Sequence, residues 1–119
     1  MASWEDVCEI AAALPGTELD AGVDNPAWRV NGKVLVRLNP RLRTPDEEER
    51  RAAGGELASI WVDRDERELL LRDDPDTFFS TPHWLTSPHV LAWLARLQTA
   101  QLRELLTDAW RARAPKRLQ

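Results

Sequence analysis

The segment from Trp28 to Leu38, WRVNGKVLVRL, limits the folds open to this chain more than any other segment. Its central dipeptide, Asn31-Gly32, favours a tight turn, and apolar residues recur on either side with strand-like spacing. Two strands joined by so short a turn can only run antiparallel. The segment therefore predicts a β-hairpin and, with it, an antiparallel sheet.

The side-chain pattern also favours one register for this hairpin. A two-residue turn would pair Arg29 with Val34 and mix charged with apolar residues on both faces. A three-residue turn, with Gly32 in the left-handed conformation, would instead pair Arg29 with Lys33. Trp28 would then pair with Val34, and the apolar and basic residues would separate. We therefore expect the three-residue turn, with a basic face that comprises Arg29, Lys33 and Arg37.

A helix is expected at each end of the chain. Ser3 and Asp6 have the spacing of a capping box, and apolar residues follow at helical spacing as far as Pro15-Gly16. This pattern predicts a first helix over residues 4–14.

The last helix is predicted from TAQLRELLTDAWRARA, in which leucines, an alanine and a tryptophan form one apolar stripe. Thr99 is placed to cap this helix, and Pro115 is placed to end it.

The middle of the chain mixes strand and helix signals. Residues 57–62, LASIWV, predict a strand, and Asp63 with Glu66 then predicts a capped short helix. Residues 77–80, TFFS, favour a further short strand. Residues 89–97, HVLAWLARL, are ambiguous, because their composition favours a helix while their apolar residues also alternate as in a strand.

These elements together indicate an α+β fold in a single domain of 119 residues, with an antiparallel β-sheet and helices packed on one face. Residues 39–56 contain two prolines, two adjacent glycines and nine charges without an apolar stripe, so we expect a mobile connection there. Residues 114–119 are expected to form a basic tail.

Composition narrows the classes of protein to which the chain can belong. No apolar run approaches the ~20 residues that span a bilayer, and the amino terminus lacks the pattern of a signal peptide. The single cysteine, Cys8, allows no internal disulfide and no cysteine-rich zinc site. We therefore expect a cytoplasmic protein without membrane partner, metal or cofactor.

The net charge of −4 hides a separation of charge along the chain. Residues 28–43 hold five basic residues and the last ten residues hold four, without an acid in either segment. Such segments can form a local basic surface that attracts phosphate groups. The alternative is an ordinary solvated sheet face together with cations favoured by a helix dipole. The candidate nucleic-acid contacts are Arg29, Lys33, Arg37, Arg41, Arg43, Arg113, Lys116 and Arg117.

Both histidines lie in the segment TPHWLTSPHV, residues 81–90. His83 and His89 have no neighbouring carboxylate or cysteine, so they fall short of a zinc site and of a catalytic base with its orienting group. We interpret His83 as an anchor of the turn. The alternative is a loop that contacts a ligand or partner through His83, Trp84 and His89.

Several segments, quoted as they stand, resemble the MmcQ/YjbR family of small bacterial proteins. They are RVNGKVLVRL, SIWVDRDERELLLRDDPDTFFSTPH and LLTDAWRARAPKRL, which together span most of the chain. The resemblance implies a CyaY-like (frataxin-like) α+β fold, in which HVLAWL is a strand. It also implies DNA binding through hairpins arranged as two wings. The residues WLTSPH, after His83, depart from the turn usual in the family.

The sequence thus predicts a non-enzymatic domain that binds DNA through a basic hairpin and a basic C-terminal tail. The second hypothesis is a module that binds a protein or a small ligand with the loop around His83 and Trp84. A third hypothesis is an enzyme built on that loop.

Overall fold

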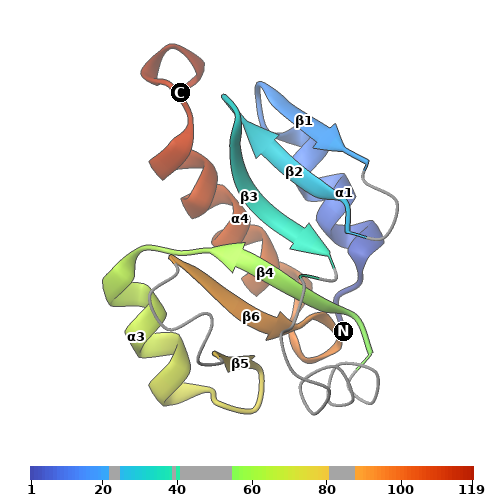
Figure 1. Cartoon of the computed structure of the whole chain (residues 1–119), viewed down its shortest axis with the longest axis vertical. Helices are drawn as coiled ribbons and strands as arrows, with labels where there is room; N and C mark the ends of the chain where they lie inside the picture. The colour runs from blue at the N-terminus through green and yellow to red at the C-terminus, as the bar shows by residue number, and fades with distance from the viewer. Residues whose placement is uncertain (22–24, 39, 41–54, 81–87) are drawn as a thin grey trace.

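Strands from both halves of the chain form one antiparallel sheet in the order β1-β2-β3-β4-β6-β5 (Figure 1). The computed structural model describes residues 1–21, 25–38, 40, 55–80 and 88–119. The strands are β1 (Thr17–Asp20), β2 (Ala27–Val30), β3 (Lys33–Leu38), β4 (Leu57–Trp61), β5 (Phe78–Phe79) and β6 (His89–Trp93). The helices are α1 (Trp4–Ala13), α3 (Arg64–Asp73), α4 (Thr99–Arg113) and the 3₁₀ turns η2 (Leu94–Arg96) and η3 (Lys116–Leu118).

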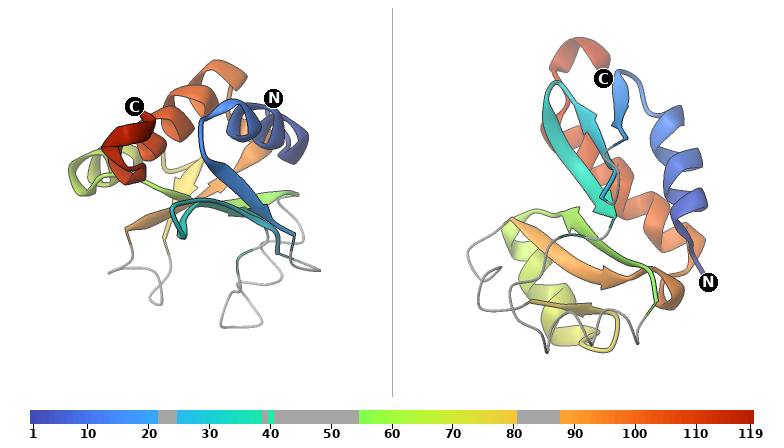
Figure 2. Two further views of the ribbon diagram at one scale, coloured as in Figure 1. Left: turned by 90° about the horizontal axis from the view of Figure 1, so that it is seen from above. Right: turned by 45° about the vertical axis from the view of Figure 1, so that its right-hand side comes forward.

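Helices α1 and α4 cover one face of this sheet (Figure 2). The main core lies between them and the sheet, and the buried side chains of Val7, Val30, Ile60, Leu102 and Leu106 belong to it. Leucines of α3 pack against the edge of the same core. This arrangement confirms the α+β prediction of an antiparallel sheet in a single domain.

A second, smaller apolar cluster lies on the opposite face of the sheet. Leu57, Leu91 and Trp93 are buried there, with Phe79 packed against them. The rings of Phe79 and Trp93 stack with their centroids 5.3 Å apart. Both faces of β4 and β6 are therefore apolar, which explains why the pattern of residues 89–97 fits helix and strand equally well. The structure resolves the ambiguity in favour of a strand.

The predicted register of the hairpin is wrong. Asn31 and Gly32 both have positive φ angles, 51° and 76°, and form a two-residue turn that pairs Val30 with Lys33. The extra residue lies inside β3, because the pairing shifts between Trp28 and Arg29. This bulge lets Leu35 and Val36 be buried although they are consecutive. The bulge within β3, and not the turn, therefore separates the charged residues of the hairpin from the apolar residues of the core.

The corrected register moves one cation to the other face of the sheet. Residues paired across a ladder project on the same face, so Lys33 shares the face of Val30, which carries α1 and α4. Arg29 and Arg37 project on the opposite face. The expected basic face of Arg29, Lys33 and Arg37 therefore does not form.

The helix ends agree with the sequence at α1 and differ at the two later helices. At α1 the Ser3 side chain and the Asp6 carboxylate form the predicted capping box. Asp63 is the N-cap residue of α3, as predicted, but its side chain makes no capping hydrogen bond, so the expected capping pair with Glu66 does not form. The N-cap of α4 is Gln98, so the prediction that Thr99 caps that helix is wrong.

Strand β1 is an element that the sequence did not predict. It is the edge strand next to β2, and three of its four residues are exposed. An edge strand with little burial carries no apolar alternation, so periodicity has nothing to detect. In the part of the chain that the structure describes, no helix has the length and apolar character needed to cross a membrane.

Candidate nucleic-acid interface

The C-terminal segment packs against the turn between α1 and β1. The indole Nε1 of Trp110 donates a hydrogen bond to the Pro15 carbonyl at 2.8 Å. Leu118 of η3 lies so close to Gly16 that a Cβ at that glycine would sit 2.5 Å from its Cδ1. The side chain of Gln119 donates to the carbonyls of Arg111 and Ala114 and closes this end of the chain. The residues expected as a basic tail thus form a short helical turn held on the domain.

Strand pairing brings the hairpin turn to the same end of the molecule. Thr17, next to Gly16, pairs with Val30, and Val30 pairs with Lys33. Lys33 also projects on the face that carries α4. The hairpin turn and η3, about eighty residues apart in sequence, lie together at the top of Figure 1 and of the right-hand view in Figure 2.

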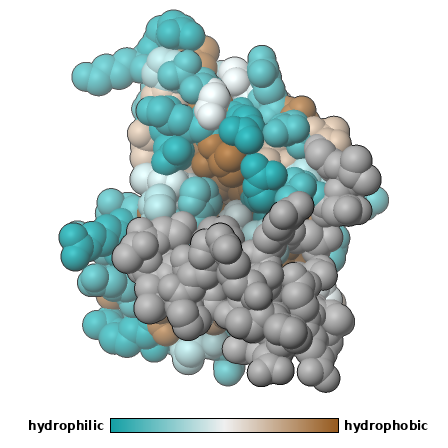
Figure 3. All heavy atoms as spheres, viewed as in Figure 1, coloured by the Kyte–Doolittle hydropathy of each residue, from teal (hydrophilic) through white to brown (hydrophobic). Residues whose placement is uncertain are grey.

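We call the exposed cations at this place the basic end. They are Lys33, Arg111, Lys116 and Arg117. Figure 3 shows hydrophilic side chains gathered over this upper part of the molecule. Residues 109–119 contain no Asp or Glu, so no acidic side chain of the C-terminal segment offsets these charges. The basic end therefore offers cations from two distant segments to one anionic partner.

Two further predicted contacts already have partners within the protein. Arg29 forms an ion pair with Asp20 at 3.4 Å and donates to the Gly32 carbonyl. Arg37 donates to the Asn25 carbonyl at 2.9 Å. Both arginines project away from the face of Lys33, so the structure does not bring them into the basic end. Their guanidinium groups already form hydrogen bonds within the sheet, so they are less available to an external partner.

Arg113 has a different environment from the other C-terminal cations. Its guanidinium carbon lies 5.1 Å from the centroid of the Trp61 ring, which is a cation–π contact. Its Nε is buried without a hydrogen-bond partner in the described part of the chain. Burial lowers the pKa of the Arg113 guanidinium. Trp61 is only half-buried and covers this arginine.

His89 lies beside this pair, because it is the strand partner of Trp61. Burial, followed by the positive charge of Arg113, lowers the pKa of its imidazole to about 4. A hydrogen bond with the Val34 backbone acts in the opposite direction, and the charge of Arg37 lowers the pKa further. His89 is therefore neutral at physiological pH and sits next to two arginines.

Arg67 of α3 supports the backbone at this point. Its Nε donates to the His89 carbonyl at 3.2 Å, and one terminal nitrogen donates to the Ser80 hydroxyl at 3.0 Å. The sequence did not single out Arg67, because nothing in its local pattern distinguishes it from the other charges of α3. Arg41, Arg43, His83 and Trp84 lie outside the described residues.

Acidic residues gather on another side of the molecule. Burial raises the pKa of Glu66 on α3, and the nearby charges of Asp108, Asp63 and Glu104 raise it further. Helix α3 and the middle of α4 thus form an acidic side, away from the end of α4 that belongs to the basic end (Figure 1). The segregation of charge along the sequence becomes a segregation in space.

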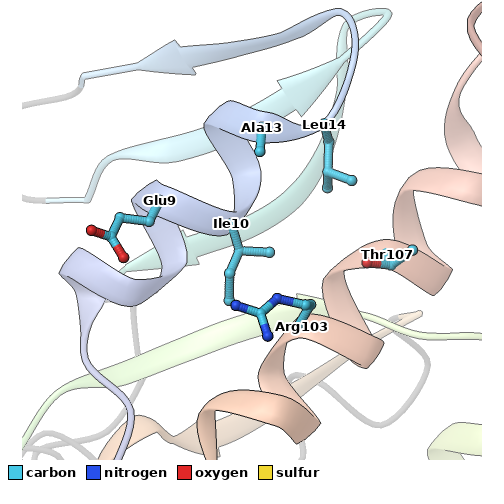
Figure 4. Close-up of a pocket in the computed structure, with 6 residues that line it drawn as sticks. All are labelled: Glu9, Ile10, Ala13, Leu14, Arg103 and Thr107. Atoms are coloured by element: carbon cyan, nitrogen blue, oxygen red, sulfur yellow. The ribbon is translucent and has the colours of Figure 1, made fainter.

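A shallow groove of about 210 Å³ runs between α1 and α4 (Figure 4). Its charged residues are Glu9 and Arg103, one of each sign, and the rest of its wall is formed by Ile10, Ala13, Leu14 and Thr107. The two charges offset each other, so this groove adds no net attraction for an anion. Among the described residues, no group of three or more histidine, cysteine or carboxylate side chains could hold a metal ion.

The comparison with known families decides the affiliation of the chain. A family model described as YjbR matches residues 12–112, which is most of the chain. The chain belongs to the YjbR family. The resemblance drawn from the hairpin, the central segment and the C-terminal helix is thereby confirmed.

Similar proteins occur in mycobacteria. The uncharacterized proteins Rv2570 of Mycobacterium tuberculosis and Mb2600 of Mycobacterium bovis are each 39% identical to this chain over 124 residues. In both cases the match covers 99% of this chain and 93% of the relative. Both relatives are described as uncharacterized, so the similarity shows that the proteins are related but does not indicate a function.

The YjbR fold is also present in a solved structure. The crystal structure of Deinococcus radiodurans protein DR2400, which carries the domain named DUF419, matches with a TM-score of 0.68. The match covers 92% of this chain and 77% of that protein at 19% sequence identity. At that identity the likeness concerns the fold, and any function of this YjbR domain has to be argued from its own residues.

Proposed function

We propose that this YjbR protein is a non-enzymatic domain that binds nucleic acid, with DNA as its partner, through the basic end. The observation that carries the proposal is that the start of β3 with Lys33 and the η3 turn with Lys116 and Arg117 lie at the same end of the molecule (Figure 1). These residues come from segments far apart in sequence, and the packing of Leu118 on Gly16 holds them at one end of the domain. A fixed set of cations can contact several phosphates of one strand at once.

Phosphate contacts of this kind give affinity without sequence preference. Each neutralised phosphate releases a counterion, so the affinity falls as the salt concentration rises. The four exposed cations of the basic end correspond to a slope of log K against log salt of about −3 to −4. The net charge of −4 does not oppose this, because α3 and the middle of α4 carry acids on a different side.

The supporting contacts at Arg113 fit the same proposal. The Trp61 ring beneath its guanidinium holds the last turn of α4 against the end of β4. That contact limits the movement of the segment that bears Arg111, Lys116 and Arg117. A rigid arrangement of cations loses less conformational entropy when it binds.

The experiment is a titration of fluorescently labelled duplex DNA with the purified protein at two salt concentrations. Anisotropy should rise on addition of protein at low salt, and the affinity should fall steeply at the higher salt. Duplexes of unrelated sequence should bind equally well. If no binding occurs at low salt, the proposed function is wrong.

We also propose that the protein acts in the cytoplasm, where DNA is accessible in bacteria. The single free cysteine, Cys8, suits a reducing compartment. Cell fractionation followed by immunodetection tests this location. Recovery of the protein in an extracellular or membrane fraction would contradict it.

A further inference from the structure

A cluster of polar side chains lies on the sheet face that does not carry α1 and α4. Arg37 pairs across the ladder with Ser59, and Trp61 pairs with His89. Ser59 and Trp61 are two residues apart on β4, so all four side chains project on the same face. Ser59 is 2% exposed and is one of the few buried polar residues in the described part of the chain. The cluster therefore combines two potential cations or donors, a hydroxyl and an aromatic ring.

Arg113 joins this cluster from the helical layer. The described pairing of β3 with β4 ends at Val36 and Ile60. Beyond that pair, the first residues of β3, from Lys33, and the last residue of β4, Trp61, are not paired with each other. The sheet thus opens at this corner, and the guanidinium of Arg113 reaches the Trp61 ring there. We call Arg37, Ser59, Trp61, His89 and Arg113 the corner cluster.

The positive charges of the corner cluster have no counter-ion on the described part of the protein. The ion pairs found there involve Arg29 with Asp20 and Arg72 with Asp73, and neither includes Arg37 or Arg113. Among the residues that the structure describes, Arg37 is bound only to a backbone carbonyl, and the Nε of Arg113 is buried without a partner. Partly burying guanidinium groups without an anion is unfavourable. An external anion would relieve that cost.

We propose that the corner cluster is a binding site for an oxyanion, namely a phosphate group, held by the guanidinium groups of Arg113 and Arg37. Guanidinium forks match the geometry of phosphate oxygens, and stacking on Trp61 fixes the plane of one of them. Ser59 is buried, pairs with Arg37 across the ladder and stands two residues from Trp61 on β4, so its hydroxyl offers a further hydrogen bond.

This site goes beyond the proposed function, because it would take a phosphate group by itself and lies apart from the exposed basic end. The phosphate can come from a free phosphate compound or from a nucleic-acid strand. Both sources present the same group to the two arginines, a negatively charged phosphate, as a dianion in one case and a diester in the other. The test therefore starts with inorganic phosphate alone, so that its result does not depend on DNA binding.

The first experiment adds inorganic phosphate to the intact protein at a fixed ionic strength set with sodium chloride. Binding should change the tryptophan fluorescence saturably and raise the melting temperature by at least ~2 °C at saturation. By NMR, the pKa of His89 should rise from about 4, because the bound anion offsets the charges of Arg113 and Arg37. If phosphate does no more than chloride at the same ionic strength, the proposal is wrong.

Variants locate the effect. Arg113→Gln and Arg37→Gln should each weaken phosphate binding by ~10-fold or more, since each removes a charge-assisted contact. Arg103→Gln is the matched control, because it removes an exposed cation from the same helix, outside both the corner cluster and the basic end, and should leave phosphate binding unchanged. If Arg113→Gln does not fold, the comparison of Arg37→Gln with Arg103→Gln is the test. Equal losses in Arg37→Gln and Arg103→Gln would mean that phosphate is attracted only by overall charge, and would overturn the proposal.

A second arm identifies the source of the phosphate group. Duplex DNA is titrated in the presence and absence of saturating inorganic phosphate, again at matched ionic strength. Competition between the two supports the site and assigns it to the nucleic-acid backbone. Simultaneous binding supports the site and assigns it to a free phosphate compound.

Discussion

The guanidinium carbon of Arg113 lies 5.1 Å from the ring centroid of Trp61 and joins the last turn of α4 to the end of β4. These residues are far apart in sequence, so the contact is purely tertiary. It fixes the C-terminal end of α4, from which the basic end projects, and it also brings Arg113 next to His89. The basic end and the corner cluster thus share one structural support.

The first prediction concerns the strength of this contact. In a double-mutant cycle with Trp61→Leu and Arg113→Gln, the coupling energy should be about 0.5–1 kcal/mol at this half-exposed site. Urea unfolding of the four proteins gives the value. The matched cycle with Trp61→Leu and Arg111→Gln should show no coupling, because Arg111 points to solvent. Equal coupling in both cycles would mean that the stacking is not specific.

The second prediction concerns the stability of the protein in mild acid. Since burial and Arg113 lower the pKa of His89 to about 4, the unfolded chain binds a proton on this histidine at higher pH than the folded protein does. The free energy of unfolding should therefore fall as the pH drops from about 6.5 to about 4, by up to about 3 kcal/mol from this group.

The measurement for His89 compares wild type with His89→Gln by urea unfolding at several pH values. The difference between the two proteins isolates the histidine, because the carboxylates titrate in both. That difference should be constant above pH 7 and should shift in favour of the variant as the pH falls towards 4. A difference independent of pH would show that His89 is not kept neutral by the fold.

The third prediction uses two glycines with positive φ angles, 73° at Gly16 and 76° at Gly32. An alanine at either site costs about 1 kcal/mol or more for the left-handed backbone. Only at Gly16 does the new Cβ also meet Leu118, whereas nothing lies within 4 Å at Gly32. Thermal unfolding should therefore show a larger loss for Gly16→Ala than for Gly32→Ala. Equal losses would contradict the packing of η3 on the α1–β1 turn.

The fourth prediction concerns the acidic side of the molecule. Burial and the charges of Asp108, Asp63 and Glu104 raise the pKa of Glu66, so the ionised form is disfavoured in the folded protein. Stability from this group is lost as the pH rises from the unfolded value of 4.5 through the higher folded value. Glu66→Gln should raise the melting temperature at pH 7 and not at pH 3.5. Glu68→Gln, on the same helix, is the control.

The sequence predicted the elements that depend on local signals. The capping box at Ser3 and Asp6 and the apolar stripe of α4 each depend on residues close in sequence, and each formed as expected. The Asn31-Gly32 turn lies where the sequence placed it, but it has two residues instead of the expected three. The strand β6 (His89–Trp93) was expected from the family resemblance and not from its own pattern, because burial on both faces hides the alternation.

The parts that could not be predicted depend on tertiary packing. Val34, Leu35 and Val36 are consecutive apolar residues, so no pattern tells which of them a bulge adds to the core. Strand β1 exists because β2 offers it an edge, not because of its own residues. Likewise, nothing near Arg113 in the sequence indicates that its partner is Trp61. The candidate cations were found from the sequence, but their division between the basic end and the corner cluster was not.

The division of roles among the cations follows from the corrected hairpin. Lys33 projects on the face that carries α4, near η3, whereas Arg37 projects on the opposite face and belongs to the corner cluster. Arg29 forms an ion pair with Asp20. Substituting Arg29 should therefore affect the stability of the β1–β2 edge more than the affinity for DNA. Exposed ion pairs of this kind contribute at most about 1 kcal/mol.

The most direct test of the proposed function is the salt dependence of DNA binding in a variant that lacks three cations of the basic end. For Lys33→Gln with Lys116→Gln and Arg117→Gln, the slope of log K against log salt should be shallower than in wild type by about 2–3. The matched control carries Arg64→Gln, Arg72→Gln and Arg103→Gln, which also remove three exposed cations but outside the basic end, and its slope should equal that of wild type. A triple variant that binds DNA with the wild-type slope would contradict the assignment of DNA binding to the basic end.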